Sequence, residues 1–361
     1  MKRICLIGQF PPPIHGLSKA LETIVQSDYL KDKYELNCVD IKDNKRFISN
    51  LRKIEKMDAD MYYFTISQTK FGNLRDMIIL WRLLTKRKKV IIHYHGGYYK
   101  ELYSNLNFVQ KRINKKLISR IDRMIALSHG LKVIFEDVIE YEKIRVCENY
   151  VEDSSLIGNE YFDMKIKRMY EEKKTLEVVY LSNFIKTKGY YDVLQAANQL
   201  KRNGKDIQFS FAGGFFSKQE KEEFFSYIQE NNLQDIVTYH GVVKGEKKKE
   251  LLLNADVFAL PTYYPKEGQP ISIIEAMGNG LAIITTEHAG IPDIVNPENG
   301  YLINSESPNE ISEAINDLLN NRGKLVEFAQ RNRSYALKEF KETDYIKRLE
   351  KIFDEVLEHE N

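Results

Sequence analysis

The sequence predicts an α/β protein with two Rossmann-like lobes, each built on a doubly wound parallel sheet. Its 361 residues exceed the ~250–300 residues that one core usually reaches, so two domains are expected. Short apolar strands alternate with helices along the chain, which is the signature of parallel sheets with helical crossovers. A charged segment at 152–174 interrupts this alternation and separates two series.

The first series fills the first lobe, residues 1–155. Apolar runs predict strands at 2–8, 34–41, 61–67, 89–97, 123–128 and 143–149. Apolar residues at helical spacing predict helices at 19–30, 48–58, 73–88 and 129–138, with one more between the fourth and fifth strands.

The second lobe is expected at 172–341. Its strands are predicted at 176–182, 206–214, 236–243, 256–262 and 281–286. Its helices are predicted at 189–204, 218–232, 246–255 and 270–277, and from 308 onward the chain reads as helical. Ser307 and Pro308 suit the N-cap and first position of that helical region. The last helix, about 342–361, is expected to pack back on the first lobe. A ligand site is expected in a cleft between the lobes, at the carboxyl ends of both sheets.

The charge is unevenly distributed along the chain. Residues 1–165 hold 29 Lys and Arg against 21 Asp and Glu, whereas the remainder is net negative. In the stretches 81–89 and 110–120, basic residues adjoin apolar ones. Such a face can dock on anionic lipid, at ~1 kcal/mol per well-placed cation. The alternative is that both stretches are solvated faces of surface helices.

Targeting and redox features favour the cytoplasm. The apolar run at the N-terminus is too short for the core of a signal peptide. No stretch approaches the ~20 apolar residues that span a bilayer. Cys5, Cys38 and Cys147 are far apart, which indicates neither a disulfide framework nor a zinc site. We therefore expect a cytoplasmic protein, peripheral on the inner face of the plasma membrane if the basic half docks there.

Residues 261–290 carry the strongest functional signal. Glu267 and Glu275 stand eight positions apart, and Pro270 predicts a helix start between them. The free N–H groups of a helix start attract phosphate. Carboxylates beside an anion site suit a ligand with hydroxyl groups and phosphates, and a nucleotide-sugar fits that description. The alternative for Glu275 is a capping or salt-bridging helix residue.

The run EGQPISIIEAMGNGLAIITT resembles the E-x7-E segment of the family-4 retaining glycosyltransferases of the GT-B fold. The resemblance extends over essentially the whole chain. It implies that Glu267 contacts hydroxyls of the donor sugar and that Glu275 holds the ribose. Further donor contacts are implied for the backbone between them, at Gly268, Gln269, Pro270 and Ile271.

The stretch 181–197 is similar to the family's strand, loop and helix whose basic pair grips the diphosphate. Lys188 and Gly189 match the lysine and glycine of that pattern. Asn183 stands where many members carry arginine, and the nearby Lys186 is a candidate to compensate. The alternative for Lys188 is a solvent-exposed loop lysine.

Two segments of the first lobe also match. GQFPPPIHGLS resembles the loop after the first strand, where Gly16 lets the backbone approach donor and acceptor. His15 is either an acceptor contact or a plain loop residue. His95 in HYHGG matches a histidine that faces the donor sugar, whereas His93 is expected to pack in the sheet.

Two further matches complete the resemblance. Asn149 resembles the asparagine that ends the family's first lobe, although Tyr150 replaces the usual next glycine, and it is a candidate acceptor contact. HGVV resembles the segment whose backbone meets the nucleobase, with Gly241 and Val242 beside the ring.

The resemblance implies transfer of a sugar from a nucleoside diphosphate, UDP above all, with retention of configuration. The acceptor would be a hydroxyl of a lipid-linked or growing glycan of a surface polysaccharide, such as capsule or O-antigen. Glu267, Lys188 and His95 are the residues expected to act in catalysis. No cofactor, metal or nucleic-acid partner is expected, and Asp58 and Asp60, which resemble a DxD metal motif, read as a turn before a strand.

Two other functions are compatible with the sequence. One is another GT-B enzyme, such as a sugar-nucleotide epimerase or a phosphorylase. The other is a non-catalytic nucleotide-sugar- or glycan-binding partner of a larger assembly, which Asn183 favours. An epimerase needs no acceptor, so incubation with a nucleotide-sugar alone distinguishes it.

Overall fold

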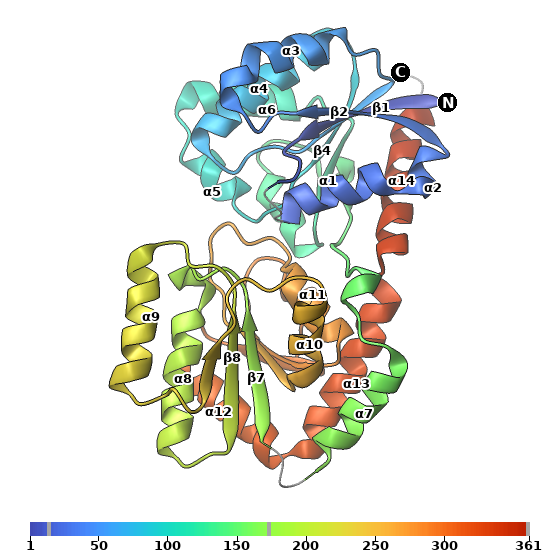
Figure 1. Cartoon of the computed structure of the whole chain (residues 1–361). Coiled ribbons are helices and arrows are strands. Elements are labelled where there is room, and N and C mark those ends of the chain that lie inside the picture. The colour runs from blue at the N-terminus through green and yellow to red at the C-terminus, as the bar shows by residue number, and fades with distance from the viewer. Residues whose placement is uncertain (13–15, 172–174, 359–361) are drawn as a thin grey trace. The chain divides into compact units, whose positions relative to one another are not determined.

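The computed structural model describes residues 1–12, 16–171 and 175–358 (Figure 1). The chain divides into two compact units, the first comprising Met1–Glu148 with Thr343–Asn361 and the second Asn149–Glu342. Each unit contains one six-stranded parallel sheet flanked by helices. The predicted α/β class with two doubly wound sheets is therefore confirmed. The cleft predicted between the units stays a prediction.

The sheet of the first unit has the order β2-β1-β3-β4-β5-β6, and all its strand pairs are parallel. The strands are β1 (Lys2–Gly8), β2 (Tyr34–Asp40), β3 (Met61–Phe64), β4 (Lys89–His93), β5 (Arg123–Ala126) and β6 (Ile144–Val146). The central strand β3 is buried along its whole length, because helices cover both faces of a parallel sheet.

Helices of the first unit form a layer on each face of its sheet (Figure 1). One layer contains α3 (Phe47–Lys56), α4 (Lys70–Thr85) and α6 (Phe108–Ile118), and the other contains α1 (Gly16–Gln26) and α14 (Glu342–Glu358). Shorter helical segments are α2 (Asp28–Lys31), α5 (Tyr99–Ser104), η1 (Asn44–Arg46), η2 (Gly130–Phe135) and η3 (Tyr141–Lys143).

The end of the chain is held on the first sheet by α14. The Tyr34 hydroxyl donates to Asp354 Oδ1 at 2.6 Å, and Arg123 pairs with Glu355 at 2.6 Å. None of the described helices is long and apolar enough to cross a bilayer.

The sheet of the second unit has the order β12-β11-β10-β7-β8-β9 and is also parallel. Its strands are β7 (Leu176–Leu181), β8 (Ile207–Ala212), β9 (Val237–Tyr239), β10 (Val257–Leu260), β11 (Ala282–Thr286) and β12 (Gly300–Ile303). Its helices are α7 (Asn159–Met169), α8 (Tyr190–Arg202), α9 (Lys218–Glu230), α10 (Glu246–Asn254), α11 (Ile271–Gly278), α12 (Pro308–Asn320) and α13 (Arg322–Glu339), with η4 (Asp153–Ser155) and η5 (Lys186–Lys188). Helices α8 and α9 lie on one face of this sheet, and α10 and α11 on the other (Figure 1).

Two elements were not predicted, and one predicted helix was wrong. The charged segment at 152–174 contains α7, whose pattern was hidden because Lys165 occupies a buried position and donates to the carbonyls of Leu252 and Asn279, both at 2.9 Å. Strand β12 was missed, since its apolar run is only four residues long. The α-helix predicted at 129–138 is instead the short 3₁₀ helix η2. Helices of this type are common in connections between longer elements.

Candidate active site

The strand order of the second sheet reverses at β7. From β7 the chain proceeds outward to β8 and β9, and the later strands β10, β11 and β12 are added on the other side of β7. The loops that follow β7 and β10 therefore leave the sheet in opposite directions, and such a switch point is where α/β sheets bind ligands. The motif that contains Lys188 follows β7, and the motif that contains Glu267 and Glu275 follows β10.

The loop after β7 is seated against the loop after β10. The Tyr263 N–H donates to the Thr187 carbonyl at 2.8 Å. Gly189 has a φ of +78°, and a Cβ at this position would lie 2.4 Å from the Pro261 carbonyl oxygen. Only glycine tolerates both the left-handed backbone and this close approach. Gly189 thus fixes where the adjacent Lys188 points.

Lys188 and Glu267 form an ion pair across the two loops. The Lys188 Nζ lies 2.6 Å from Glu267 Oε2, and both side chains are largely buried. The Thr262 hydroxyl donates to the same oxygen at 3.1 Å, and the ammonium lies 5.1 Å from the centre of the Tyr264 ring. A ligand phosphate would compete for the ammonium and ligand hydroxyls for the carboxylate, so the pair is suited to a ligand that carries both groups.

Glu275 has a partner that the sequence did not reveal. It lies in α11, is 8% exposed, and pairs with Lys248 of α10 at 2.5 Å. Three consecutive lysines occupy 247–249, and nothing in their local pattern distinguishes the one that faces α11. The salt-bridging alternative for Glu275 is therefore present in this structure, beside the ribose contact that the resemblance implies.

The backbone between the two glutamates is braced by buried contacts. Asn149 donates from its backbone N–H to Gln269 Oε1 and from its Nδ2 to the Gln269 carbonyl, both at 2.7 Å. The Gly268 carbonyl accepts from Gly290 at 2.9 Å. Pro270 occupies the N-cap position of α11, with a φ of −67°, and Ile271 is the first helical residue. Asn149 is thus engaged with the 267–271 loop, and its contact with an acceptor stays a prediction.

The remaining predicted donor contacts also follow strands of this sheet. Asn183 is exposed after β7, and its carbonyl accepts from the Tyr180 hydroxyl at 3.0 Å. Gly241 follows β9 with a φ of +69°, and its carbonyl accepts from Gly213 at 2.8 Å. Val242 is 66% exposed. These positions lie at the same edge of the sheet as Lys188 and Glu267, because the carboxyl ends of parallel strands share one edge.

In the first unit, the His95 ring packs against the His93 ring at a tilt of 32°. Their ring centres are 3.9 Å apart, and the Nδ1 of His93 lies 2.5 Å from the Tyr63 hydroxyl. Burial and the neighbouring His95 lower the pKa of His93 well below its usual value, so its imidazole is neutral. The prediction that His93 packs in the sheet is confirmed. Gly16 is the first residue of α1, and His15 lies outside the described residues.

The two carboxylates with the DxD spacing, Asp58 and Asp60, both contact Arg3. Asp60 accepts from the Arg3 backbone N–H at 2.7 Å, and Asp58 pairs with the Arg3 guanidinium at 2.8 Å. Both lie between α3 and β3, which confirms the interpretation as a turn. Within residues 1–12, 16–171 and 175–358, no three His, Cys, Asp or Glu side chains gather as metal ligands would.

Residues 163–336 match the family model described as "Glycosyl transferases group 1". This span is therefore similar to the group 1 glycosyl transferases. It contains Lys188, Gly241, Glu267 and Glu275 of the predicted site, whereas Asn149 and the predicted residues of the first unit lie outside it.

Relatives with similar sequences support a glycosyltransferase. The uncharacterized glycosyltransferase MJ1069 of Methanocaldococcus jannaschii is 24% identical over 87% of this chain and 80% of its own length. The amylovoran biosynthesis glycosyltransferase AmsK of Erwinia amylovora is 28% identical over 43% of this chain and 36% of its own length.

A solved structure shows the same fold over both units. Anabaena Alr3699/HepE in complex with UDP and glucose superposes with a TM-score of 0.77 at 15% identity, covering 98% of this chain and 100% of that one. The chain therefore has the GT-B fold.

Proposed function

We propose that this protein transfers a sugar from a nucleoside diphosphate, UDP above all, to a hydroxyl of a lipid-linked or growing glycan. The observation that carries the proposal is the buried Lys188–Glu267 pair at the switch point of the second sheet. Its ammonium suits the diphosphate and its carboxylate suits sugar hydroxyls. The Anabaena structure, described with UDP and glucose, supports a uridine nucleotide.

In the proposed reaction, Lys188 leaves Glu267 for the diphosphate as the donor binds. The carboxylate is then free to accept hydrogen bonds from the donor sugar. Lys188 and the first N–H groups of α11 stabilise the charge that grows on the leaving diphosphate. That cationic environment removes the need for a metal ion, and the reaction is proposed to retain configuration by front-face attack, with the leaving phosphate accepting the proton of the acceptor hydroxyl. His95 is proposed to face the donor sugar from the first unit.

The proposed setting is the synthesis of a surface polysaccharide such as capsule or O-antigen. The relative AmsK, named for amylovoran biosynthesis, supports it. The proposed acceptor, a lipid-linked or growing glycan, would be presented to the enzyme at a surface.

An anionic membrane is proposed as that surface, docked by the layer of α4 and α6 in the first unit. These two helices are joined by reciprocal amide hydrogen bonds between Asn73 and Asn114, at 2.8 and 2.9 Å. Phe71 on α4 is 89% exposed and Phe108 on α6 is 76% exposed. Large apolar side chains at such exposure are unusual on a solvated face and suit insertion among lipids.

Charge on the same layer matches anionic headgroups. Helix α6 contains four basic residues and no acidic one. They are Lys111, Arg112, Lys115 and Lys116. Trp81 is 49% exposed on α4, followed by the basic residues of 82–89. Attachment of this layer to the inner face of the plasma membrane is therefore part of the proposal.

The donor is tested first by a thermal-shift screen of UDP-, GDP- and ADP-sugars on the whole protein, because a bound donor raises the melting temperature by mass action. We expect stabilisation by a UDP-sugar in the presence of EDTA. Transfer is then followed with a lipid-linked oligosaccharide acceptor. Stabilisation by none of these nucleotides would contradict the donor site, and conversion of the sugar without an acceptor would indicate an epimerase. Loss of activity in EDTA would contradict metal independence.

A further inference from the structure

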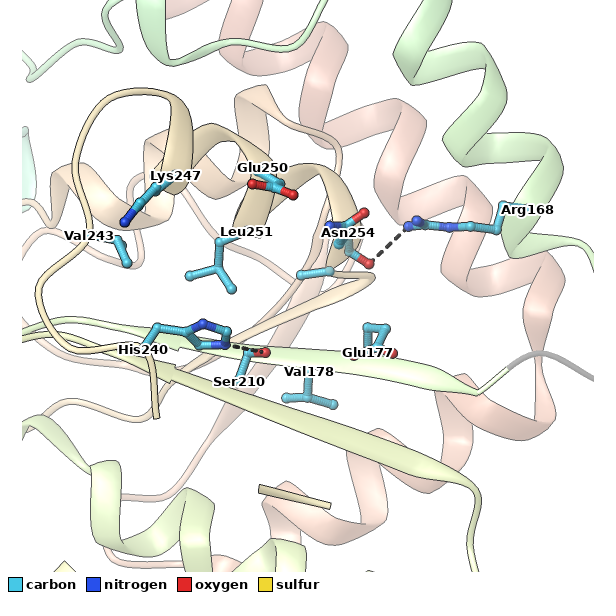
Figure 2. Close-up of a pocket in the computed structure, with 11 residues that line it drawn as sticks. Arg168, Glu177, Val178, Ser210, His240, Val243, Lys247, Glu250, Leu251 and Asn254 are labelled. Atoms are coloured by element: carbon cyan, nitrogen blue, oxygen red, sulfur yellow. Dashed lines mark hydrogen bonds between the residues drawn. The ribbon is translucent and has the colours of Figure 1, made fainter. Parts of the chain in front are cut away.

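The second unit holds a pocket of about 660 Å³ that contains none of the predicted donor residues Lys188, Glu267 and Glu275. Its size falls in the ~300–1,000 Å³ range of small-molecule sites. Figure 2 shows Ser210 and Val178 on the sheet and His240 just after β9, all below α10, whose Lys247, Glu250 and Asn254 lie above them. The pocket is therefore a trough between one face of the sheet and one face of a helix.

Helix α10 separates this trough from the candidate donor site. Lys247, Glu250 and Asn254 are spaced at i, i+3 and i+7, so they share one face of the helix. Lys248 points from a different face to Glu275 of α11. The trough residues and Lys248 thus lie on different faces of α10, and substitutions on the trough face leave the Lys248–Glu275 pair in place.

The floor of the trough offers neutral groups that both donate and accept. His240 Nε2 lies 3.1 Å from the Ser210 hydroxyl. Burial lowers the pKa of His240, so its imidazole is neutral near pH 7. At the far end, Arg168 donates to the Asn254 carbonyl at 3.0 Å (Figure 2). Its Nε is buried without a hydrogen-bond partner among the described residues.

The charges of the lining exclude simple ionic ligands. Lys247 and Arg168 are cationic, whereas Glu250 and Glu177 are anionic, so a polyanion or polycation would meet like charge. A purely apolar ligand would displace water from the exposed charged ends of Lys247 and Glu250 without replacing its hydrogen bonds. A ligand with several hydroxyl groups satisfies all of them, because each hydroxyl donates and accepts. Apolar side chains in the lining, such as Val178 and Leu251, suit the C–H faces of sugar rings.

We propose that this trough is a second carbohydrate site, which binds a neutral oligosaccharide segment apart from the donor site. The ligand chemistry follows from the lining, whereas its assignment as a segment of the acceptor or product glycan rests on the proposed function. Held there, a growing chain would stay on the enzyme between transfers. His240 and Val243 of the trough flank Gly241 and Val242, the segment predicted to meet the nucleobase.

The test is binding of the whole protein to an array of neutral hexose and N-acetylhexosamine oligosaccharides, three to six sugars long. Glu250→Ala and His240→Phe remove trough groups, and both residues are exposed enough for the fold to tolerate the change. Glu246→Ala is the matched control, since Glu246 lies on the same helix but does not line the trough. We expect each trough variant to weaken binding by about tenfold. That is the effect of losing one hydrogen bond to a charged group or several neutral hydrogen bonds. The control should bind as the wild type does.

Binding to no oligosaccharide, or equal binding by the trough variants and the wild type, would overturn the second site. The thermal shift with UDP-glucose is measured on the same proteins. Oligosaccharide binding without stabilisation by UDP-glucose would contradict the proposed donor site but not the second carbohydrate site. Stabilisation by UDP-glucose without oligosaccharide binding would contradict the second carbohydrate site alone.

Discussion

The Lys188 ammonium and the Glu267 carboxylate lie 2.6 Å apart although 79 positions separate them in the chain. The contact depends on the close seating of Gly189 against Pro261, which brings the loop after β7 onto the loop after β10. A buried pair of this kind contributes little to stability in comparison with an apolar pair of the same size. Its position at the switch point is better explained by ligand binding.

Replacing Lys188 or Glu267 by alanine is expected to reduce sugar transfer at least ~100-fold, since each removes an electrostatic contact made in the transition state. Steady-state transfer from a UDP-sugar measures the effect. Each single variant also leaves its partner as a buried, unpaired charge, which costs ~3–5 kcal/mol of unfolding free energy.

The double variant Lys188→Met/Glu267→Gln separates fold from function. It removes both charges, so its melting temperature should return toward that of the wild type while transfer stays lost. Lys218→Ala is the control for loss of an exposed lysine of the second unit, since Lys218 pairs with Glu222 and not with Glu267. Near-normal turnover in either single alanine variant would refute the assignment of this pair to the active site.

The placement of Lys188 by its glycine neighbour gives a second prediction. Gly189→Ala should cost ~3 kcal/mol or more, because it combines a left-handed alanine with a backbone clash at Pro261. Gly204→Ala should cost only ~1 kcal/mol, since Gly204 has a similar φ of +65° but open space around its Cβ. Urea unfolding measures both. Equal losses in the two variants would show that the clash at Pro261 is relieved by the chain.

Local pattern accounts for the parts of the molecule that the sequence predicted. Alternation of strands and helices predicted both sheets, and Lys188 and Glu267 stood out because each lies in a short motif beside a helix start. Contacts between helices that are separate in the sequence have no such local motif. Lys248 looks like its neighbours in sequence, and only the packing of α10 on α11 selects it. The helix α7 was not predicted because Lys165 occupies one of its buried positions. A lysine can be buried there because its ammonium donates to backbone carbonyls.

Lys248→Ala is expected to weaken binding of the donor nucleotide by about tenfold. The change leaves the Glu275 carboxylate without its cation, and an unpaired negative charge repels the diphosphate and disfavours the site. Titration with the UDP-sugar that binds the wild type measures the change, with Lys249→Ala as the control for loss of one positive charge from α10. Equal effects of the two substitutions would show that Lys248 acts only through the overall positive charge of α10 and not through its pair with Glu275.

His93 should make folding stability depend on pH. Its pKa is lowered in the folded protein, so below the unfolded value of ~6.5 the unfolded chain binds more protons. His93 therefore destabilises the fold increasingly as the pH falls below 6.5, by up to ~1.4 kcal/mol per pH unit. In His93→Phe this contribution to the slope disappears, although the lost contact with Tyr63 lowers stability at every pH. Urea unfolding at pH 7.5, 6 and 5 measures the difference, and parallel pH curves for the two proteins would contradict a buried neutral His93.

The exposed phenylalanines of α4 and α6 give the prediction for membrane docking. Phe71→Ser with Phe108→Ser should reduce partitioning to phosphatidylglycerol vesicles at least tenfold, because burying each phenylalanine in lipid is worth ~1.5–3 kcal/mol. Co-sedimentation at low salt measures it, and high salt should release the wild type. Phe216→Ser is the matched control, since Phe216 is 79% exposed and belongs to the second unit rather than to these helices. If docking involves this helix layer, the control binds vesicles as the wild type does while the double variant does not. Equal partitioning of all three proteins would show that lysines and arginines alone hold any vesicle-bound fraction, and absence of binding by the wild type would remove the membrane from the proposed function.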